Sequence, residues 1–218
     1  NNINNIFNII NSFNYKNKKI IKKIEKIKCL IPTQALEGDI SPDVLQDFRF
    51  IISKLKKNNI DFEMKRLDCW SPDYHRRSLL KIIENEGAQN FNELINNNKS
   101  KITINLRNNL LFGKNITDET IKTLKHDLKD LKKKIISTFE EYDLIIMPTT
   151  PQNSFNISNK TPENQANFTS LANIADLPSL CLPFYSKNKQ PSSLQLISSN
   201  MNDEFLIKIS SFFEKILQ

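Results

Sequence analysis

A strand, a helix and a second strand follow one another early in the chain, and this succession constrains the fold more than any other feature of the sequence. Residues 27–31 read Ile-Lys-Cys-Leu-Ile, which is typical of a short buried strand. Residues 60–67 alternate apolar and charged side chains, as a strand with one solvent-facing side does. Between them an amphipathic helix is expected over 43–57, with Ser41 as its N-cap. Two strands joined through a helix favour a parallel crossover.

The rest of the chain continues the alternation. An apolar stripe with steps of three and four residues predicts a long helix over 117–142, which leads directly into another strand. Residues 72–98 read as one or two helices that break near Gly87. We therefore expect one α/β domain over residues 1–218, with a mixed, largely parallel central sheet flanked by helices. The expected strands are 27–31, 60–67, 144–147, 180–185 and 194–197, and the other expected helices are 3–13, a short one within 167–178, and 203–217.

The third expected strand ends in Pro-Thr-Thr-Pro, which makes a stiff polar corner. Pro148 and Pro151 fix φ on either side of two hydroxyl groups. Ligands of α/β proteins gather at the carboxyl ends of strands. We therefore take Thr149, Thr150 and Asn173 as candidate substrate-pocket residues, because they supply hydroxyl and amide groups without charge. The alternative is that both threonines only satisfy the backbone of a tight turn.

Several kinds of chemistry leave no trace in the sequence. The three glycines, Gly38, Gly87 and Gly113, are far apart, so the chain has no phosphate loop, no dinucleotide fingerprint and no Gly-x-Ser-x-Gly elbow. His75 and His126 read as surface or capping residues. We expect no metal and no cofactor, and no residue of the chain is assigned a catalytic role.

Charge and cysteine usage bear on partners and location. The formal net charge of +7 comes from scattered lysines, which indicates solvated helix surface more than an RNA or membrane face. Cys29, Cys69 and Cys181 read as free thiols in a reducing compartment. No apolar run approaches the length of a transmembrane helix. We expect a cytoplasmic location, with an organelle left open, and no membrane partner.

The last third of the sequence closely resembles the C-terminal part of the amidase signature family. The stretches that carry this resemblance are FEEYDLIIMPTTP, then NFTSLANIADLPSLCLP, then PSSLQLI and the helix that follows. The family pattern has the same order: Asp, a hydrophobic run and Pro-Thr-x-Pro, then Asn-x-Ala-Gly-Leu-Pro-Ala, then Pro-x-Gly-Leu-Gln. The segment over 27–67 looks like the strand, helix and strand that follow the family's catalytic serine.

The resemblance implies hydrolysis of a carbon–nitrogen (amide) bond, or transfer of the amide nitrogen. In that family a Ser nucleophile is activated through a second Ser, in a cis peptide, by a Lys. These residues belong to a Ser- and Gly-rich segment of the N-terminal half, and nothing in residues 1–218 matches it. We therefore expect a C-terminal part of such an enzyme, incomplete at its N-terminal side, with catalytic residues outside this chain. A noncatalytic relic domain is the alternative.

Some residues depart from the family pattern. Asp176 and Ser193 stand where the family has Gly, and a positive φ at either position would carry a strain cost of roughly 1 kcal/mol. The chain also resembles the amidotransferase branch of the family, whose A-type chain amidates glutamyl-tRNA(Gln) and holds the glutamine through an Arg and an Asp. The nearest residues here are Asn108 or Asn109, with Arg107 out of step, and Ala166 or Asn167.

The two enzymatic readings differ in the partners they imply. Both imply a small amide substrate, which suits uncharged pocket groups, and a homodimer stays open in each. The amidotransferase reading adds partner subunits and tRNA.

Overall fold

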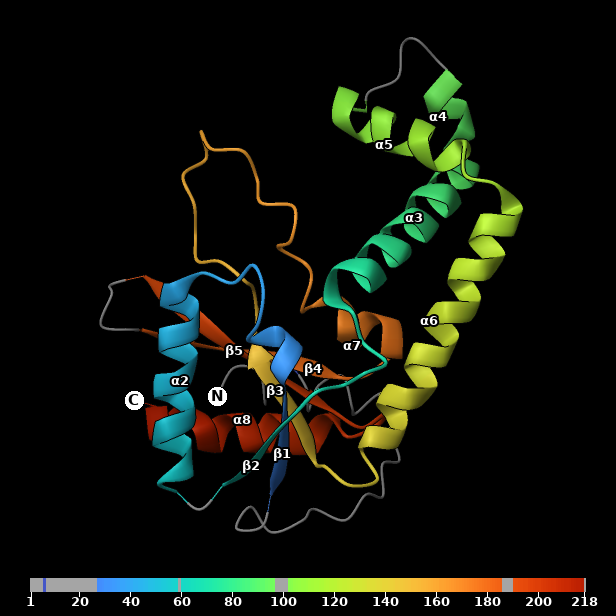
Figure 1. Ribbon diagram of the computed structural model, residues 1–218. Coiled ribbons are helices and arrows are strands. Elements are labelled where there is room, and N and C mark those ends of the chain that lie inside the picture. Colours follow the sequence, from blue (N-terminus) through green and yellow to red (C-terminus); the bar gives the residue numbers. More distant parts are fainter. Residues whose placement is uncertain (1–5, 7–26, 59, 97–101, 186–189, 218) are drawn as a thin grey trace.

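The computed structural model describes residue 6 and residues 27–58, 60–96, 102–185 and 190–217 (Figure 1). The expected helix over 3–13 lies outside the described residues, apart from Ile6.

The described strands form a five-stranded sheet in the order β2-β1-β3-β5-β4. β1 is parallel to both β2 and β3, whereas β5 is antiparallel to β3 and β4. Among these five strands β5 therefore alone runs in the opposite direction. The expectation of one mixed, largely parallel sheet is confirmed. The bounds are β1 Lys28–Pro32, β2 Asp61–Lys65, β3 Leu144–Pro148, β4 Ser179–Tyr185 and β5 Pro191–Ser198.

Helices cover both faces of the sheet, and alternate strand residues enter the two cores. Leu144 and Ile146 of β3 point to the core under α2 and α8. Ile145 and Met147 point to the core under α6 and α7. This two-residue period follows from the pleat of the strand. The helices are η2 Thr33–Ala35, α2 Pro42–Lys56, α3 Pro72–Asn90, α4 Asn92–Asn96, α5 Ile104–Lys114, α6 Asp118–Thr138, α7 Ser170–Ala175 and α8 Asp203–Leu217.

Side-chain caps define the start of two long helices. The Ser41 hydroxyl accepts the Val44 N–H at 3.3 Å, which confirms the expected N-cap of α2. Thr117 caps α6 in the same way by accepting the Thr120 N–H at 3.3 Å. α6 ends at Thr138, four residues before the sequence indicates, because turns over 139–142 complete the connection to β3.

The expected helix break near Gly87 is wrong, because α3 continues through Gly87 to Asn90. The reason is the crossing of α3 and α5, which extend away from the sheet (Figure 1). A Cβ at Gly113 of α5 would lie 2.2 Å from the Glu84 backbone, and one at Gly87 would lie 2.9 Å from Leu110 Cδ2. Both glycines therefore serve a close approach of two helices.

We predict that Gly113→Ala destabilises the protein by about 1–3 kcal/mol, because the new methyl group meets rigid backbone. Gly87→Ala is the matched control. Its methyl group meets the flexible end of Leu110, and alanine has the higher helix propensity. Urea unfolding should show a lower midpoint for Gly113→Ala than for Gly87→Ala, and equal midpoints would contradict this account of the crossing.

Candidate functional site

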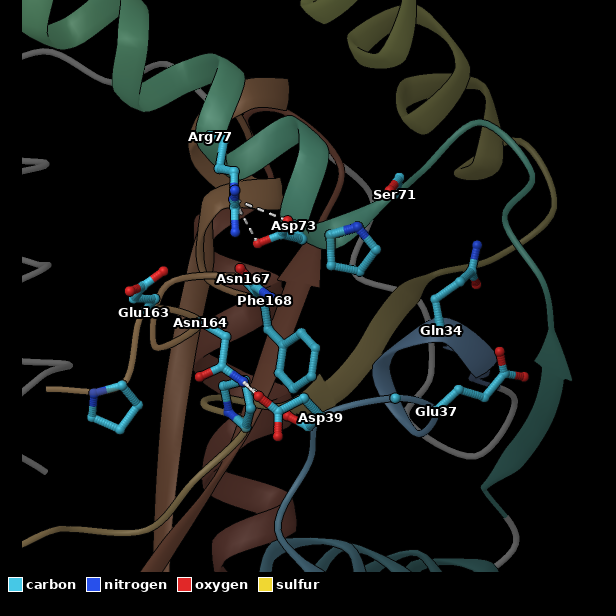
Figure 2. Close-up of a pocket in the computed structure, with 14 residues that line it drawn as sticks. Gln34, Glu37, Asp39, Ser71, Asp73, Arg77, Glu163, Asn164, Asn167 and Phe168 are labelled. Atoms are coloured by element: carbon cyan, nitrogen blue, oxygen red, sulfur yellow. Dashed lines mark hydrogen bonds and ion pairs between the residues drawn. The ribbon is translucent and has the colours of Figure 1, made fainter. Parts of the chain in front are cut away.

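A cavity of about 590 Å³ opens at the carboxyl ends of the three parallel strands β1, β2 and β3 (Figure 2). The loop after each strand supplies part of its lining. Gln34, Glu37 and Asp39 follow β1, Ser71, Asp73 and Arg77 follow β2, and Pro151, Asn164 and Phe168 follow β3. The cavity has the size of a small-molecule site and lies where α/β sheets bind ligands.

The Pro-Thr-Thr-Pro corner is bonded to two other elements. The Ser41 N–H at the start of α2 donates to the Pro151 carbonyl at 2.8 Å, and the Thr149 N–H donates to the Ser193 carbonyl of β5 at 3.1 Å. The Thr150 hydroxyl donates to the Gln152 carbonyl at 2.8 Å. These bonds hold the corner in place, and Pro151 forms part of the cavity wall.

Amide side chains connect the loop after β3 to the loop after β1. Asn164 is buried, and its Nδ2 donates to the Asp39 carbonyl at 2.9 Å and to Asp39 Oδ2 at 2.8 Å. Its Oδ1 accepts the Gln152 Nε2 at 2.5 Å, and Gln152 Oε1 accepts Gln165 Nε2 at 2.9 Å. Every link is a directed hydrogen bond, so the network fixes how these loops face the cavity.

Gln34 joins the loops after β1 and β2. Its side chain is buried, with Nε2 donating to the carbonyls of Leu67 at 2.5 Å and Trp70 at 3.2 Å. Its Oε1 accepts the Leu67 N–H at 3.1 Å. The amide therefore satisfies loop backbone groups that no strand or helix ladder pairs.

Most charged groups of the lining have an opposite charge beside them. Glu37 accepts from Arg66 at 2.8 Å, and Asp73 lies 3.0 Å from Arg77 and 3.2 Å from Arg76. Lys160, 3.1 Å from Glu163, lowers the pKa of that carboxyl. These additional charged residues form surface ion pairs, so their charges are largely balanced at the cavity.

Ser71 and His75 resemble a nucleophile and base in sequence spacing, but their geometry is that of a helix cap. His75 Nδ1 accepts the backbone N–H of Ser71 at 2.9 Å, and the ring is buried at the start of α3. Burial lowers the pKa of His75. The expected capping role is thus confirmed, and the nitrogen that a serine hydroxyl would need is occupied by backbone.

The structure separates the candidate pocket residues. Thr149 is buried, and its hydroxyl has no hydrogen-bond partner among the described residues. Asn173 lies exposed on α7, where its Nδ2 donates to the Thr169 carbonyl at 3.3 Å. It lines another, more open hollow of about 320 Å³ together with Asp176. The substrate role of Thr149, Thr150 and Asn173 stays a prediction.

Asp39, Asn164 and Gln34 are residues of the cavity that no sequence pattern singled out. Gln34 and Asp39 follow a predicted strand, so their position at its carboxyl end was the available signal. Asn164 lies in a polar loop without periodicity, and its contact with Asp39 spans 125 residues. No local pattern encodes a contact of that kind.

The two departures from glycine have different outcomes. Asp176 is the left-handed C-cap of α7, with φ 52° and ψ 48°, so the expected strain applies there. Its carboxylate pairs with Lys132 of α6. Ser193 lies inside β5 in extended backbone, where serine has no such cost.

Metal-binding and membrane-spanning features are both missing from the described part of the chain. No group of three or more His, Cys, Asp or Glu side chains there is arranged to hold a metal ion. No described helix combines the length and apolarity that crossing a membrane requires.

Comparison with known proteins adds a family. The family model described as Amidase matches residues 13–207. The A-type chain of the glutamyl-tRNA(Gln) amidotransferase from Legionella pneumophila is 24% identical over 211 residues, covering 86% of this chain and 43% of the relative. The chain thus spans less than half the length of that curated relative.

Solved structures share the fold. A structure described as an amidase aligns with a TM-score of 0.78 and 16% identity, over 88% of this chain and 46% of the other. The A-type chain of the glutamyl-tRNA(Gln) amidotransferase from Thermotoga maritima aligns with a TM-score of 0.69 and 21% identity, over 87% of this chain and 42% of the other. At these identities the likeness concerns the fold.

We predict opposite stability effects for the two threonines of the corner. Thr149→Val removes a buried hydroxyl that lacks a partner in the described structure, and should stabilise the protein by about 1 kcal/mol. Thr150→Val loses the bond to the Gln152 carbonyl and should cost about 0.5–1.5 kcal/mol. Thermal unfolding of both variants checks this pair, and a destabilised Thr149→Val would show that its hydroxyl is bonded.

We predict that His75 makes stability depend on pH. Because burial lowers the pKa of the folded form below 6.5, the unfolded chain binds the proton more readily as pH falls. Stability should therefore decline below about pH 6.5 until the folded form is also protonated. His75→Gln should show a smaller decline when urea unfolding is measured from pH 8 to pH 5, whereas parallel profiles would contradict the prediction.

Proposed function

Since this chain belongs to the amidase family, we propose that residues 1–218 are the C-terminal part of an enzyme that hydrolyses the amide bond of a small substrate. The reaction would follow the Ser-Ser-Lys mechanism of amidase signature enzymes, with those three residues supplied from outside this chain. The role of residues 1–218 is then to form a wall of the substrate cavity and to position the substrate.

The observation that carries this proposal is the cavity at the carboxyl ends of β1, β2 and β3. Its lining includes the neutral side chains Gln34, Ser71, Asn164 and Asn167. Hydroxyl and amide groups of this kind hydrogen-bond the C=O and N–H of an amide without requiring a charge on it. A cavity of about 590 Å³ accommodates a small amide with room for a segment that carries a nucleophile.

An outside origin of the nucleophile is supported by two observations. Ser71 is the serine in the cavity lining of the described structure, and its neighbour His75 bonds backbone. The Legionella relative is more than twice the length of the matched region, which covers 43% of it. A Ser-Ser-Lys segment of the kind the family uses would lie in the part of such relatives that this chain does not cover.

The corner candidates fit this proposal as a second wall. Thr149, Thr150 and Asn173 carry uncharged groups suited to a neutral amide. We propose that the hydroxyl of Thr149 is the most informative of the three, because it is buried without a partner among the described residues. A hydroxyl in that state gains a hydrogen bond when a new group reaches it.

A second function is favoured by the names of the relatives. Under it the chain is part of the A-type chain of a glutamyl-tRNA(Gln) amidotransferase, as the Legionella and Thermotoga proteins are. Its partners would then include other subunits and tRNA. Against it, Asn108 and Asn109 lie on α5, which is remote from the sheet, and neither lines the cavity (Figure 1). A glutamine carboxylate would therefore need another partner than these positions.

The cysteines support the proposed location in a reducing compartment, either the cytoplasm or an organelle. Cys29, Cys69 and Cys181 are all free. Burial raises the pKa of Cys29, which leaves its thiol protonated and unreactive.

We predict that residues 1–218 alone hydrolyse no simple amide, whereas the natural protein or complex that contains them does. Release of ammonia from small aliphatic amides and from glutamine should be measured for both. Turnover by residues 1–218 that is lost on Ser71→Ala would overturn the outside origin of the nucleophile.

The same assay separates the three readings. Turnover of small amides without a requirement for tRNA supports the proposed hydrolase. Ammonia release from glutamine that depends on partner subunits supports the amidotransferase. Absence of any turnover by the complete natural protein would favour a noncatalytic relic domain.

A further inference from the structure

We propose that the Asp39 carboxylate makes this cavity prefer small amides that carry a protonated amine. The inference rests on the proposed function, since it names the substrate class of the same cavity. Figure 2 shows Asp39 facing the cavity beside Asn164 and below Phe168.

The charge state of the lining singles out one carboxylate. Glu37, Asp73 and Glu163 each have a cationic partner within 3.1 Å, namely Arg66, Arg77 and Lys160. No ion pair among the described residues joins Asp39 to a cation, although Asp39 also lines the cavity. Asp39 is therefore the carboxylate of this lining whose charge is left for a ligand.

The direction of this carboxylate is fixed by its neighbours. Asp39 Oδ2 accepts from Asn164 Nδ2 at 2.8 Å, and the same nitrogen donates to the Asp39 carbonyl at 2.9 Å. Asn164 is only 9% exposed and is itself held by Gln152 at 2.5 Å. Gly38, with φ 77°, makes the turn that presents Asp39. The charge is thus held in place before a ligand arrives, which lowers the entropic cost of binding.

An ammonium group is the ligand chemistry that matches such a carboxylate. It offers three N–H donors and a positive charge, and both are complementary to a carboxylate. A neutral alkyl group offers neither, and a second carboxylate is repelled. Arg77 is the cation of the lining, but its Nε already lies 3.1 Å from Asp73 Oδ1 and 3.0 Å from Oδ2. It therefore compensates Asp73 more than it attracts an anion.

The test compares three amides with residues 1–218, by following amide chemical shifts in NMR titrations. 3-Aminopropanamide is cationic, butanamide has nearly the same shape without charge, and succinamate is anionic. Because Asp39 is exposed to solvent, we expect an affinity gain of only about two- to fivefold for 3-aminopropanamide over butanamide. Succinamate should bind most weakly, and the preference should shrink at high salt.

Two variants locate the effect. Asp39→Asn keeps an oxygen that Asn164 can donate to, so the loop should remain folded while the preference for the cation disappears. Glu37→Gln removes a carboxylate of the same lining that Arg66 already neutralises, and should keep the preference. Equal affinities of the cationic and neutral amides for the wild type, or a preference that survives Asp39→Asn, would overturn the inference.

Binding and turnover fail independently in this design. The titrations need no catalytic residue, so a lost preference rejects the role of Asp39 without bearing on hydrolysis. Conversely, absence of hydrolysis by the complete natural protein rejects the proposed function through the ammonia assay.

Discussion

The complete burial of β3 is the constraint on which the rest of the structure depends. All five of its residues are buried, and it lies between β1 and β5. A strand that is apolar on both faces must be covered on both, which requires helices on each side of the sheet. The same strand leads into the Pro-Thr-Thr-Pro corner. The demand for burial therefore also determines where one wall of the cavity stands.

The elements of the fold could be predicted because each carries a repeating signal. The apolar period of two in strands and the stripe in α6 report which side faces a core. The break near Gly87 was mispredicted because a glycine also allows the close crossing with α5, and that contact is tertiary. Asp39 and Asn164 escaped prediction for a related reason, since they meet across 125 residues. The strand-end rule located the cavity, whereas its polar contacts required the structure.

Asp176 shows how a family pattern is modified without loss of the local backbone. The residue keeps the left-handed conformation that favours glycine, and its side chain pairs with Lys132. An aspartate tolerates this conformation better than most residues, because its short polar chain can bond nearby. The pairing also links α7 to α6, both of which cover the same face of the sheet. The substitution thus exchanges backbone ease for a contact between helices.

The adjacency of β1 and β3 has a consequence for the order in which the molecule assembles. The Lys28 N–H donates to Asp143 Oδ2 at 3.0 Å across 115 residues, and the Asp143 N–H donates to the Lys28 carbonyl at 2.8 Å. Contacts this distant along the chain form only after a large loop has closed, which slows folding. Helices α3 to α6 lie within that loop and cross one another through nearer contacts. During synthesis on a ribosome, these helices emerge and associate while β1 still waits for its central neighbour.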